Sequence, residues 1–140
     1  MSKIERDKDF VPYNQALELK QLGFDEDCFG YYDTEGLQIK YDVSNPTNKN
    51  SLFTEHSITN NPKVSATTFS KAFRFFHEKY DLHNGIYPYY DGYEFQIKDF
   101  RLPTNAPING GLMKYEEAEL SCLCRLIEMA HHELYSKTKQ

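Results

Sequence analysis

The spacing of apolar residues along the 140-residue chain predicts three helices separated by two hairpins. Apolar residues recur every three or four positions in residues 11–24, 65–82 and 115–137, which is the period of a helix with one buried face. In the first of these, Pro12 suits the first helical position and Gly23 suits the left-handed residue after the helix. The buried face of this helix is expected to comprise Ala16, Leu19 and Leu22.

The second and third helices differ in the width of their apolar faces. We expect Ser65 or Thr67 to cap the second helix. Phe75 falls about 120° from the centre of its apolar stripe, at the edge of the core or exposed. That stripe comprises Phe69, Ala72, Phe73, Phe76 and Tyr80. The third helix has a wider arc, with a main stripe of Leu120, Leu123, Ile127, Ala130 and Leu134, widened by Ala118, Cys122, Leu126 and Met129. An arc of this width favours cover by the sheet on one side and by another helix or a second copy of the chain on the other.

Alternating apolar and polar residues predict a β-hairpin after each of the first two helices. In residues 28–41, we expect a turn at Asp33–Gly36 and one apolar face, formed by Phe29, Tyr31, Leu37, Ile39 and Tyr41. In residues 85–100, Asp91-Gly92 is a strong turn signal, which would place Tyr90 opposite Tyr93 and Ile86 opposite Ile97. Pro88 indicates that the first strand of this second hairpin lies at an edge of the sheet or carries a bulge.

The predicted element order is αββαββα, in which a helix–hairpin unit occurs twice before a C-terminal helix. This order indicates an α+β fold with a mainly antiparallel sheet of about four strands. The stretches YYDTEGLQIK (31–40) and YYDGYEFQIK (89–98) are identical at six of ten positions and lie in equivalent hairpins. Because these residue types are those that half-buried hairpins favour, a structural repeat is the preferred interpretation over a repeated ligand site.

The length of the chain favours a single domain over residues 1–140. Such a chain buries roughly two-thirds of its unfolded surface, and its eleven Tyr and ten Phe offer enough apolar area for a core. We expect loose ends at residues 1–9 and 138–140. Residues 42–64 are rich in Asn, Ser and Thr and predict a long polar loop, which is either a plain connection or a functional lid or partner contact.

Charge and cysteine content narrow the classes of partner and location. The formal net charge is −5 and the basic residues form no stripe, so nucleic acid is not an expected partner. No run of apolar residues is long enough for a membrane span, and the first residues lack an apolar signal core, which favours the cytoplasm. The three cysteines include a C-x-C pair and form neither a disulfide framework nor a zinc motif, so buried, reduced thiols are expected.

Three blocks of the sequence resemble a known group of proteins. FVPYNQALELKQLGFDEDCFGYYD, SKAFRFFHEKYDL and YEEAELSCLCRLIEM are similar to signature blocks of a family of small proteins encoded by phages and prophages of Bacteroides-type gut bacteria. The resemblance covers both ends and the central helix. It implies a phage-derived accessory protein in the cytoplasm of the host cell, and it supplies no catalytic residue. The loop at 42–64 lies outside the resemblance.

Exposed tyrosines are the first candidate for a functional surface. Tyr32 on the first hairpin, and Tyr87 and Tyr89 on the second, fall on the parity opposite the Ile residues. They would be exposed unless helices cover both faces of the sheet. Exposed Tyr clusters favour protein interfaces and planar ligands, so these three residues are the expected partner-binding or ligand-binding residues. The alternative is that the last helix packs on them as a second layer of core.

A catalytic alternative uses the second hairpin. Glu94 and Lys98 share one face of a strand, and Asp91 lies at the turn. This resembles a degenerate form of the PD-(D/E)xK pattern of small metal-dependent nucleases, in which acidic residues bind Mg²⁺ and position a water. The spacing departs from that pattern, and ordinary solvent-facing side chains are the simpler interpretation.

No resident metal or cofactor is expected. Glu128 and His131 have the spacing of one arm of a di-iron site, but the sequence lacks the second arm. The acidic run at 25–27 lacks the alternation of a calcium loop. We therefore expect a non-catalytic binding protein that engages a host or phage protein or sequesters a small ligand. The alternatives are the nuclease and an oligomeric structural phage component. A homodimer is expected from two observations, the wide arc of the last helix and the position of Phe75 off the stripe of the central helix.

Overall fold

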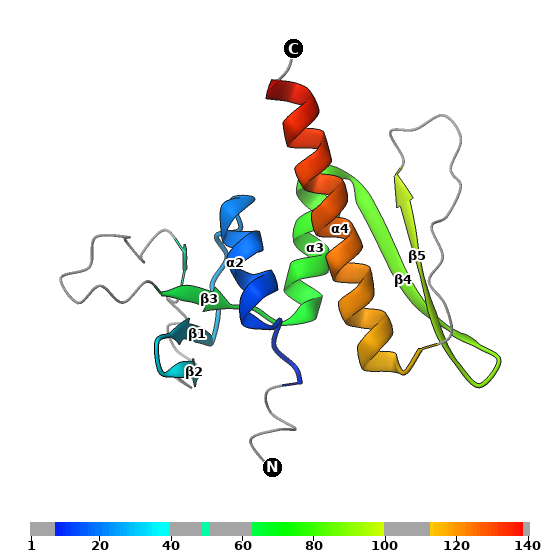
Figure 1. The fold of residues 1–140 in the computed structure, drawn as a ribbon, viewed down its shortest axis with the longest axis horizontal. Helices are drawn as coiled ribbons and strands as arrows, with labels where there is room; N and C mark the ends of the chain where they lie inside the picture. Colours follow the sequence, from blue (N-terminus) through cyan, green and yellow to red (C-terminus); the bar gives the residue numbers. More distant parts are fainter. Residues whose placement is uncertain (1–7, 40–48, 51–62, 100–112, 139–140) are drawn as a thin grey trace. The chain divides into compact units, whose positions relative to one another are not determined.

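The computed structural model describes residues 8–39, 49–50, 63–99 and 113–138. In this part of the chain it has three helices and five strands, all paired antiparallel, so the α+β class predicted from the sequence is confirmed (Figure 1). The elements in chain order are α2 (Tyr13–Gln21), β1 (Gly30–Asp33), β2 (Gly36–Ile39), β3 (Val64–Ala66), α3 (Phe69–Tyr80), β4 (Leu82–Tyr89), β5 (Gly92–Asp99) and α4 (Tyr115–Thr138).

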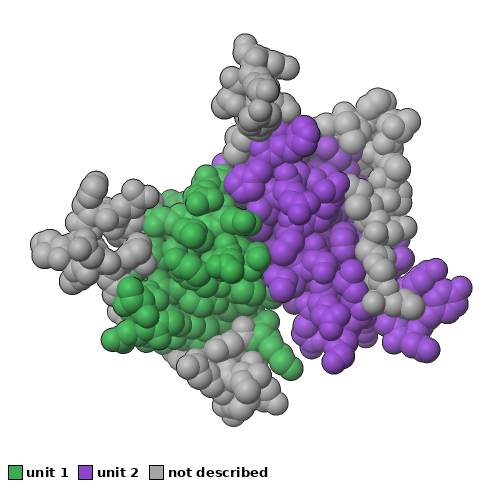
Figure 2. Space-filling view, in the orientation of Figure 1, with its two compact units in different colours: residues 1–71 green, residues 72–140 purple. Residues whose placement is uncertain are grey.

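The chain divides into two compact units, residues 1–71 and 72–140, with the boundary inside α3 (Figure 2). The single domain expected from the sequence stays a prediction. The strands form two sheets, of three and of two strands, in place of the one sheet of about four strands that we expected. Most of the expected loose ends, residues 1–7 and 139–140, and most of the expected polar loop at 42–64 lie outside the described residues. Residues 8–9 form a turn, and Thr138, expected in the loose C-terminal end, is the last residue of α4.

The first unit begins with α2, whose end follows the sequence prediction. Pro12 is the N-cap residue, one position before the helix. At the other end Gly23 has φ 95°, and the backbone N–H groups of Gly23 and Phe24 donate to the carbonyl oxygens of Lys20 and Leu19. This is the Schellman arrangement, and it buries the Phe24 ring against the end of the helix. The predicted buried face, Ala16, Leu19 and Leu22, is confirmed.

The sheet of the first unit has the order β2-β1-β3 and contacts α2 through β3. Strand β3 was not predicted, because we assigned its residues to the end of the polar loop and the start of a helix. Gly30 lies in the central strand and faces Ile39 on one side and Ala66 on the other. A Cβ at Gly30 would lie 2.9 Å from the carbonyl oxygen of Gln38, so this close approach of the strands requires glycine.

The predicted apolar face of the first hairpin is wrong. Tyr32 faces Leu37 and Tyr31 faces Gln38, so odd positions on β1 share a face with even positions on β2. Our prediction placed the odd-numbered residues of both strands on the same face. A two-residue turn instead pairs odd-numbered residues with even-numbered ones. In addition, Phe29, expected on the apolar face, is 38% exposed. Tyr41, the last residue of that predicted face, lies outside the described residues.

A buried asparagine connects two backbone segments of the first unit. The side-chain amide of Asn50 donates to the carbonyl oxygen of Phe24 (2.7 Å), and its side-chain oxygen accepts from the backbone N–H of Ser65 in β3 (2.9 Å). Asn50 is only 7% exposed. The two hydrogen bonds satisfy both ends of this amide, which offsets the cost of burying it.

The central helix begins later than expected and is capped by a different residue. The hydroxyl oxygen of Thr68 accepts from the backbone N–H of Lys71 (3.4 Å), the N-cap to N3 contact that we had assigned to Ser65 or Thr67. Ser65 instead belongs to β3, where its backbone pairs with Tyr31 of β1. The pairing of β3 with β1 therefore shortens the helix at its start.

The buried arc of α3 is rotated relative to the predicted stripe. Phe76 is buried as expected, but Phe73 is only half-buried, and Phe75 is buried instead of marginal. The Phe75 ring meets Phe76 and Tyr80 edge to face, with ring centroids 5.3 Å and 5.9 Å apart. Burial, with a smaller contribution from Glu133, raises the pKa of Tyr80. The core therefore receives Phe75, and Phe73 lies at its margin.

In the second unit, β4 and β5 form a two-stranded hairpin against which α4 packs (Figure 1). The turn residues are Tyr90 and Asp91, since Tyr89 faces Gly92. Our prediction placed the turn at Asp91-Gly92 and is wrong. As a consequence Ile86 faces Phe95, and the predicted pairing of Ile86 with Ile97 does not form. Pro88 has no backbone N–H to donate, and its nitrogen lies on the side of β4 that does not pair with β5. This agrees with the predicted edge position.

The long helix α4 buries a broad arc. Among residues 115–133, whose side chains the structure describes, the buried ones are Ala118, Cys122, Leu123, Leu126, Ile127 and Ala130. The side chain of Leu134, expected in the main stripe, lies outside that range. Leu120, expected in the main stripe, is only half-buried. The homodimer expected from this helix stays a prediction, and the burial of Phe75 within the chain removes one of the two observations that favoured it.

The repeat suggested by the sequence is not confirmed. Asp33 ends β1, whereas its sequence equivalent Asp91 is a turn residue between β4 and β5. When the two turns are superposed in sequence, Gly36 corresponds to Gly92, and the two Gln-Ile-Lys segments are out of step by two residues. The helix–hairpin order does occur twice, but β3 has no counterpart among the described residues of the second unit.

We predict that Phe76→Ala lowers the free energy of unfolding by about 3–5 kcal/mol, because the buried ring leaves a cavity that the core fills only in part. Urea denaturation followed by circular dichroism measures the loss. Phe73→Ala is the matched control on the same helix, and its half-buried ring should give a clearly smaller loss. Equal losses from the two variants would show that the buried arc is assigned incorrectly.

Asn50→Ala tests the connection in the first unit. We expect a loss of about 1–3 kcal/mol, because the Ser65 N–H and the Phe24 carbonyl lose a buried partner. Faster hydrogen exchange at the Ser65 amide should accompany the loss. The control is Lys49→Ala, which removes an exposed ion pair with Asp27 and should cost about 0–1 kcal/mol. Unchanged exchange at Ser65 would contradict the assignment.

Candidate functional site

Exposed tyrosines gather at the end of the β4–β5 hairpin. The tyrosine surface, as we name it, consists of three side chains: Tyr87 is 48% exposed, Tyr89 is 45% exposed and Tyr90 is 84% exposed. The rings of Tyr89 and Tyr90 meet edge to face with centroids 4.5 Å apart. Tyr90 has φ 53°, a conformation that is uncommon for a large residue and costs about 1–3 kcal/mol. The hairpin therefore holds an aromatic ring at its tip in a strained backbone conformation.

Alternation along the strands places part of this surface on the outer face of the hairpin. Tyr87 and Tyr89 lie on the face opposite Ile86 and Ile97, as predicted. The Tyr87 ring lies over Gly85, where an added Cβ would be 2.6 Å from two ring carbons. Gly85 therefore gives this ring a flat surface to rest on, two residues back along the same strand. The role of Tyr87 and Tyr89 in binding stays a prediction.

The third predicted binding residue, Tyr32, does not belong to an exposed surface. Its hydroxyl donates to the carbonyl oxygen of Val11 (2.8 Å), and its ring meets Tyr13 edge to face at 5.7 Å. It also shares a face with Leu37, contrary to our parity assignment. Tyr32 is therefore a half-buried structural residue of the first unit, and our prediction of its exposure is wrong.

A cleft of about 600 Å³ lies where the hairpin tip meets the start of α4. Two backbone hydrogen bonds hold this junction: Tyr93 N–H donates to the Met113 carbonyl (2.8 Å), and Met113 N–H donates to the Tyr93 carbonyl (3.2 Å). Tyr115, two residues after Met113, meets the Tyr93 ring edge to face at 5.2 Å. The cleft is lined by Asp91, Gly92, Tyr93, Met113, Lys114, Tyr115, Glu116 and Glu117.

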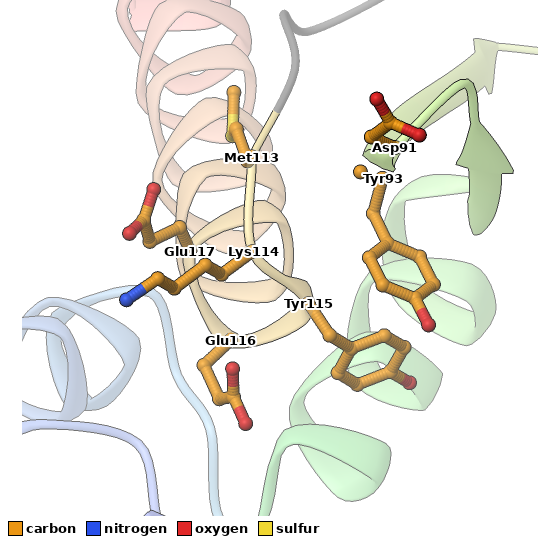
Figure 3. Close-up of a pocket in the computed structure, with 8 residues that line it drawn as sticks. Asp91, Tyr93, Met113, Lys114, Tyr115, Glu116 and Glu117 are labelled. Atoms are coloured by element: carbon orange, nitrogen blue, oxygen red, sulfur yellow. The ribbon is translucent and has the colours of Figure 1, made fainter.

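The charges around this cleft are predominantly negative. Among the residues that the structure describes, Asp91, Glu116 and Glu117 are acidic, and Lys114 is the only basic residue that lines the cleft. Figure 3 shows the rings of Tyr93 and Tyr115 together, whereas the Lys114 side chain extends to the other side of the picture. Paired aromatic rings near carboxylates form a surface that favours positively charged groups.

The catalytic alternative does not assemble at one place. Glu94 and Lys98 lie on the outer face of β5, where the Glu94 side chain accepts a hydrogen bond from Gln96 (3.4 Å). Asp91 lines the cleft together with Tyr93, whose side chain points to the opposite face from Glu94. Lys98 faces His83 at the opposite end of the hairpin from the turn that carries Asp91, so the three residues do not meet at one place. In the described ranges no group of three or more His, Cys, Asp or Glu is arranged to hold a metal ion.

Two histidines meet at the junction of α3 and β4. Their ring centroids are 3.9 Å apart, with His77 on the helix and His83 on the strand. The Nε2 of His83 lies 2.8 Å from a carboxylate oxygen of Asp81, which itself has φ 56° between the two elements. The sequence did not predict this contact, because a helix end separates the two histidines.

Two of the three cysteines are buried and chemically inert. Burial raises the pKa of Cys28 to about 11, although Lys71 nearby acts in the opposite direction. Burial also raises the pKa of Cys122 to about 12, against a hydrogen bond from Asn84. Because the thiolate is the nucleophile, neither thiol is suited to nucleophilic catalysis at neutral pH. Both observations agree with the buried thiols predicted from the sequence, whereas Cys124 is only half-buried, contrary to that prediction.

Sequence reasoning missed the cleft. Tyr93 and Met113 are twenty positions apart, and only backbone atoms join them. The one available signal was an aromatic residue, Tyr115, directly before the acidic first turn of the last helix. That signal could suggest a polar helix start, but it could not indicate that the hairpin tip lies beside it.

Comparisons with protein-family models, with curated proteins and with solved structures found no match to this chain. Within the described part of the chain, none of the helices combines the length and the apolar character that crossing a membrane requires. Arguments about function therefore rest on the residues of the chain itself.

We predict that iodoacetamide at pH 8 leaves Cys28 and Cys122 of the folded protein unmodified, because their raised pKa values keep the thiols protonated. Peptide mass spectrometry after a short exposure measures the extent of labelling. Protein unfolded in urea is the control, in which all three cysteines should be labelled. Rapid labelling of Cys122 in the folded state would contradict its assignment as inert.

The same thiols make stability depend on pH. Their pKa is raised above the ordinary value of 9.0, so the unfolded chain loses these protons first as the pH rises. Their contribution is fully present below pH 9 and is lost as the pH rises towards 11 and 12. The midpoint of urea unfolding should fall over this range, and Cys122→Ala should reduce the slope.

Proposed function

We propose that the chain is a non-catalytic binding protein, a phage accessory protein that acts in the cytoplasm of its bacterial host by engaging a partner protein through the tip of the β4–β5 hairpin. One observation carries the proposal. Four exposed tyrosines gather at this tip and at the adjacent start of α4: Tyr87, Tyr89, Tyr90 and Tyr115.

Exposed tyrosine side chains are well suited to binding another protein. A tyrosine ring buries a large area with few rotatable bonds and keeps a hydroxyl for hydrogen bonding, which is why tyrosines are frequent among residues that dominate interface energies. The strained backbone at Tyr90 supports the same interpretation, because strain in a folded protein tends to persist where it serves a function.

A protein partner is favoured over a small ligand by the distribution of the rings. Tyr87 and Tyr89 lie on the outer face of the hairpin, whereas Tyr115 lines the cleft at its tip. Small ligands are enclosed by one concave site. Rings on both the outer face and the cleft provide a broader surface, which suits a second protein.

Site-specific photo-cross-linking tests this proposal. We expect a photo-reactive phenylalanine analogue at Tyr90 to form one discrete cross-linked product in host cells. The same analogue at Tyr13, a tyrosine of similar size that is 42% exposed on α2, is the matched control and should not form that product. The double variant Tyr87→Ser, Tyr89→Ser should abolish the product, because it removes the rings that make the contact.

The cross-linked protein is then identified by mass spectrometry, purified and tested for direct binding in vitro. Equal cross-linking from Tyr13 and Tyr90 would contradict the proposal. So would a product that persists in the Tyr87→Ser, Tyr89→Ser variant, or a purified partner that does not bind.

A further inference from the structure

We infer that the cleft between the hairpin tip and the start of α4 receives an arginine side chain from a peptide segment of the partner protein. This inference rests on the proposed function, because it assigns a ligand chemistry to the concave part of the same tip. Four features of the cleft carry it: its fixed walls, its paired rings, its charge and its size.

The walls of the cleft are held in place by backbone hydrogen bonds. Tyr93 and Met113 exchange two such bonds, at 2.8 Å and 3.2 Å, which fix the segment before α4 against the start of β5. Met113 directly precedes the segment that carries Lys114 and Tyr115, so these residues cannot move far from the hairpin. A cleft formed before binding lowers the entropy cost of receiving a ligand.

The paired rings offer a surface for a planar cation. Tyr93 and Tyr115 meet edge to face at 87°, with centroids 5.2 Å apart, and Tyr115 is 45% exposed. The face of an aromatic ring carries partial negative charge and attracts a cation placed over it. Guanidinium is planar, so it can stack on such a ring.

The charges favour a cation over an anion. A helix start by itself attracts anions, since its free N–H groups act as about half a positive charge. Among the described residues that line the cleft, three full negative charges, on Asp91, Glu116 and Glu117, outweigh that half charge and the charge of Lys114. The helix dipole explains why glutamates occupy the first turn of α4, but it does not explain Asp91, which comes from the hairpin.

Arginine fits better than lysine. A carboxylate can accept two parallel hydrogen bonds from guanidinium while the same group stacks on a tyrosine, whereas ammonium is a strongly hydrated point charge. The volume of about 600 Å³ exceeds that of one side chain and leaves room for neighbouring residues of a peptide. The occupant is therefore an arginine within a segment of a partner protein.

Fluorescence anisotropy with three labelled peptides tests the inference. The peptides share a Gly-Ser backbone and carry Arg, Lys or Glu at the same positions. We expect the Arg peptide to bind about threefold more tightly than the Lys peptide, the Glu peptide not to bind, and added salt to weaken the Arg complex.

Charge-matched variants locate the site. Asp91→Asn and Glu116→Gln should each weaken binding of the Arg peptide by about threefold. Glu78→Gln is the control, because it makes the same change in net charge at an exposed position of α3 that does not line the cleft. Tyr115→Leu keeps the apolar bulk but removes the ring, and it should reduce the preference for Arg over Lys. Circular dichroism checks that each variant is folded.

The inference would be overturned by equal binding of the Arg and Lys peptides or by tighter binding of the Glu peptide. It would also be overturned if Glu78→Gln and Glu116→Gln reduced the affinity for the Arg peptide equally. Absence of binding by the Arg peptide would also overturn it. If the cross-link at Tyr90 still forms in that case, the proposed function stands without the arginine site, so the two failures can be distinguished.

Discussion

The two-residue turn at Tyr90 and Asp91 is the constraint on which the candidate site depends. It fixes the register of β4 and β5, and with it the face on which each side chain of the hairpin lies. It also directs the backbone N–H and C=O of Tyr93 away from β4, where they can pair with Met113. A shift of one residue would turn the outer tyrosines towards α4 and break the pairing that holds the cleft.

Local signals explain how much of the fold could be predicted. The presence of the three helices and the Gly23 end of α2 depend on nearby residues and were predicted correctly. Strand β3 was not, because three residues carry too little pattern and depend on pairing with β1. The rotation of the buried arc on α3, with Phe75 inside and Phe73 at the margin, likewise depends on which neighbours pack against the helix.

The candidate site was also predicted only where its features depend on nearby residues. Alternation along one strand was enough to place Tyr87 and Tyr89 on a common face. The same alternation, extended across the turn of the first hairpin, placed Tyr32 on the wrong face, because the two-residue turn pairs Tyr32 with Leu37. The cleft could not be predicted, because the bonds between Tyr93 and Met113 join backbone atoms, which every residue except proline offers equally.

The buried side chain of Asn50 has a consequence for how the first unit can vary in sequence. Its hydrogen bonds to Phe24 and Ser65 fix one interior point of the connection between β2 and β3. The connection therefore consists of two shorter loops, one on each side of Asn50, instead of one long loop. Doubling the length of a loop adds only about 0.6 kcal/mol to the free energy of closing it. Insertions on either side of Asn50 can therefore lengthen one closure without disturbing the other. The connection can diverge in length in two independent parts while the pairing of β1 with β2 and β3 is preserved.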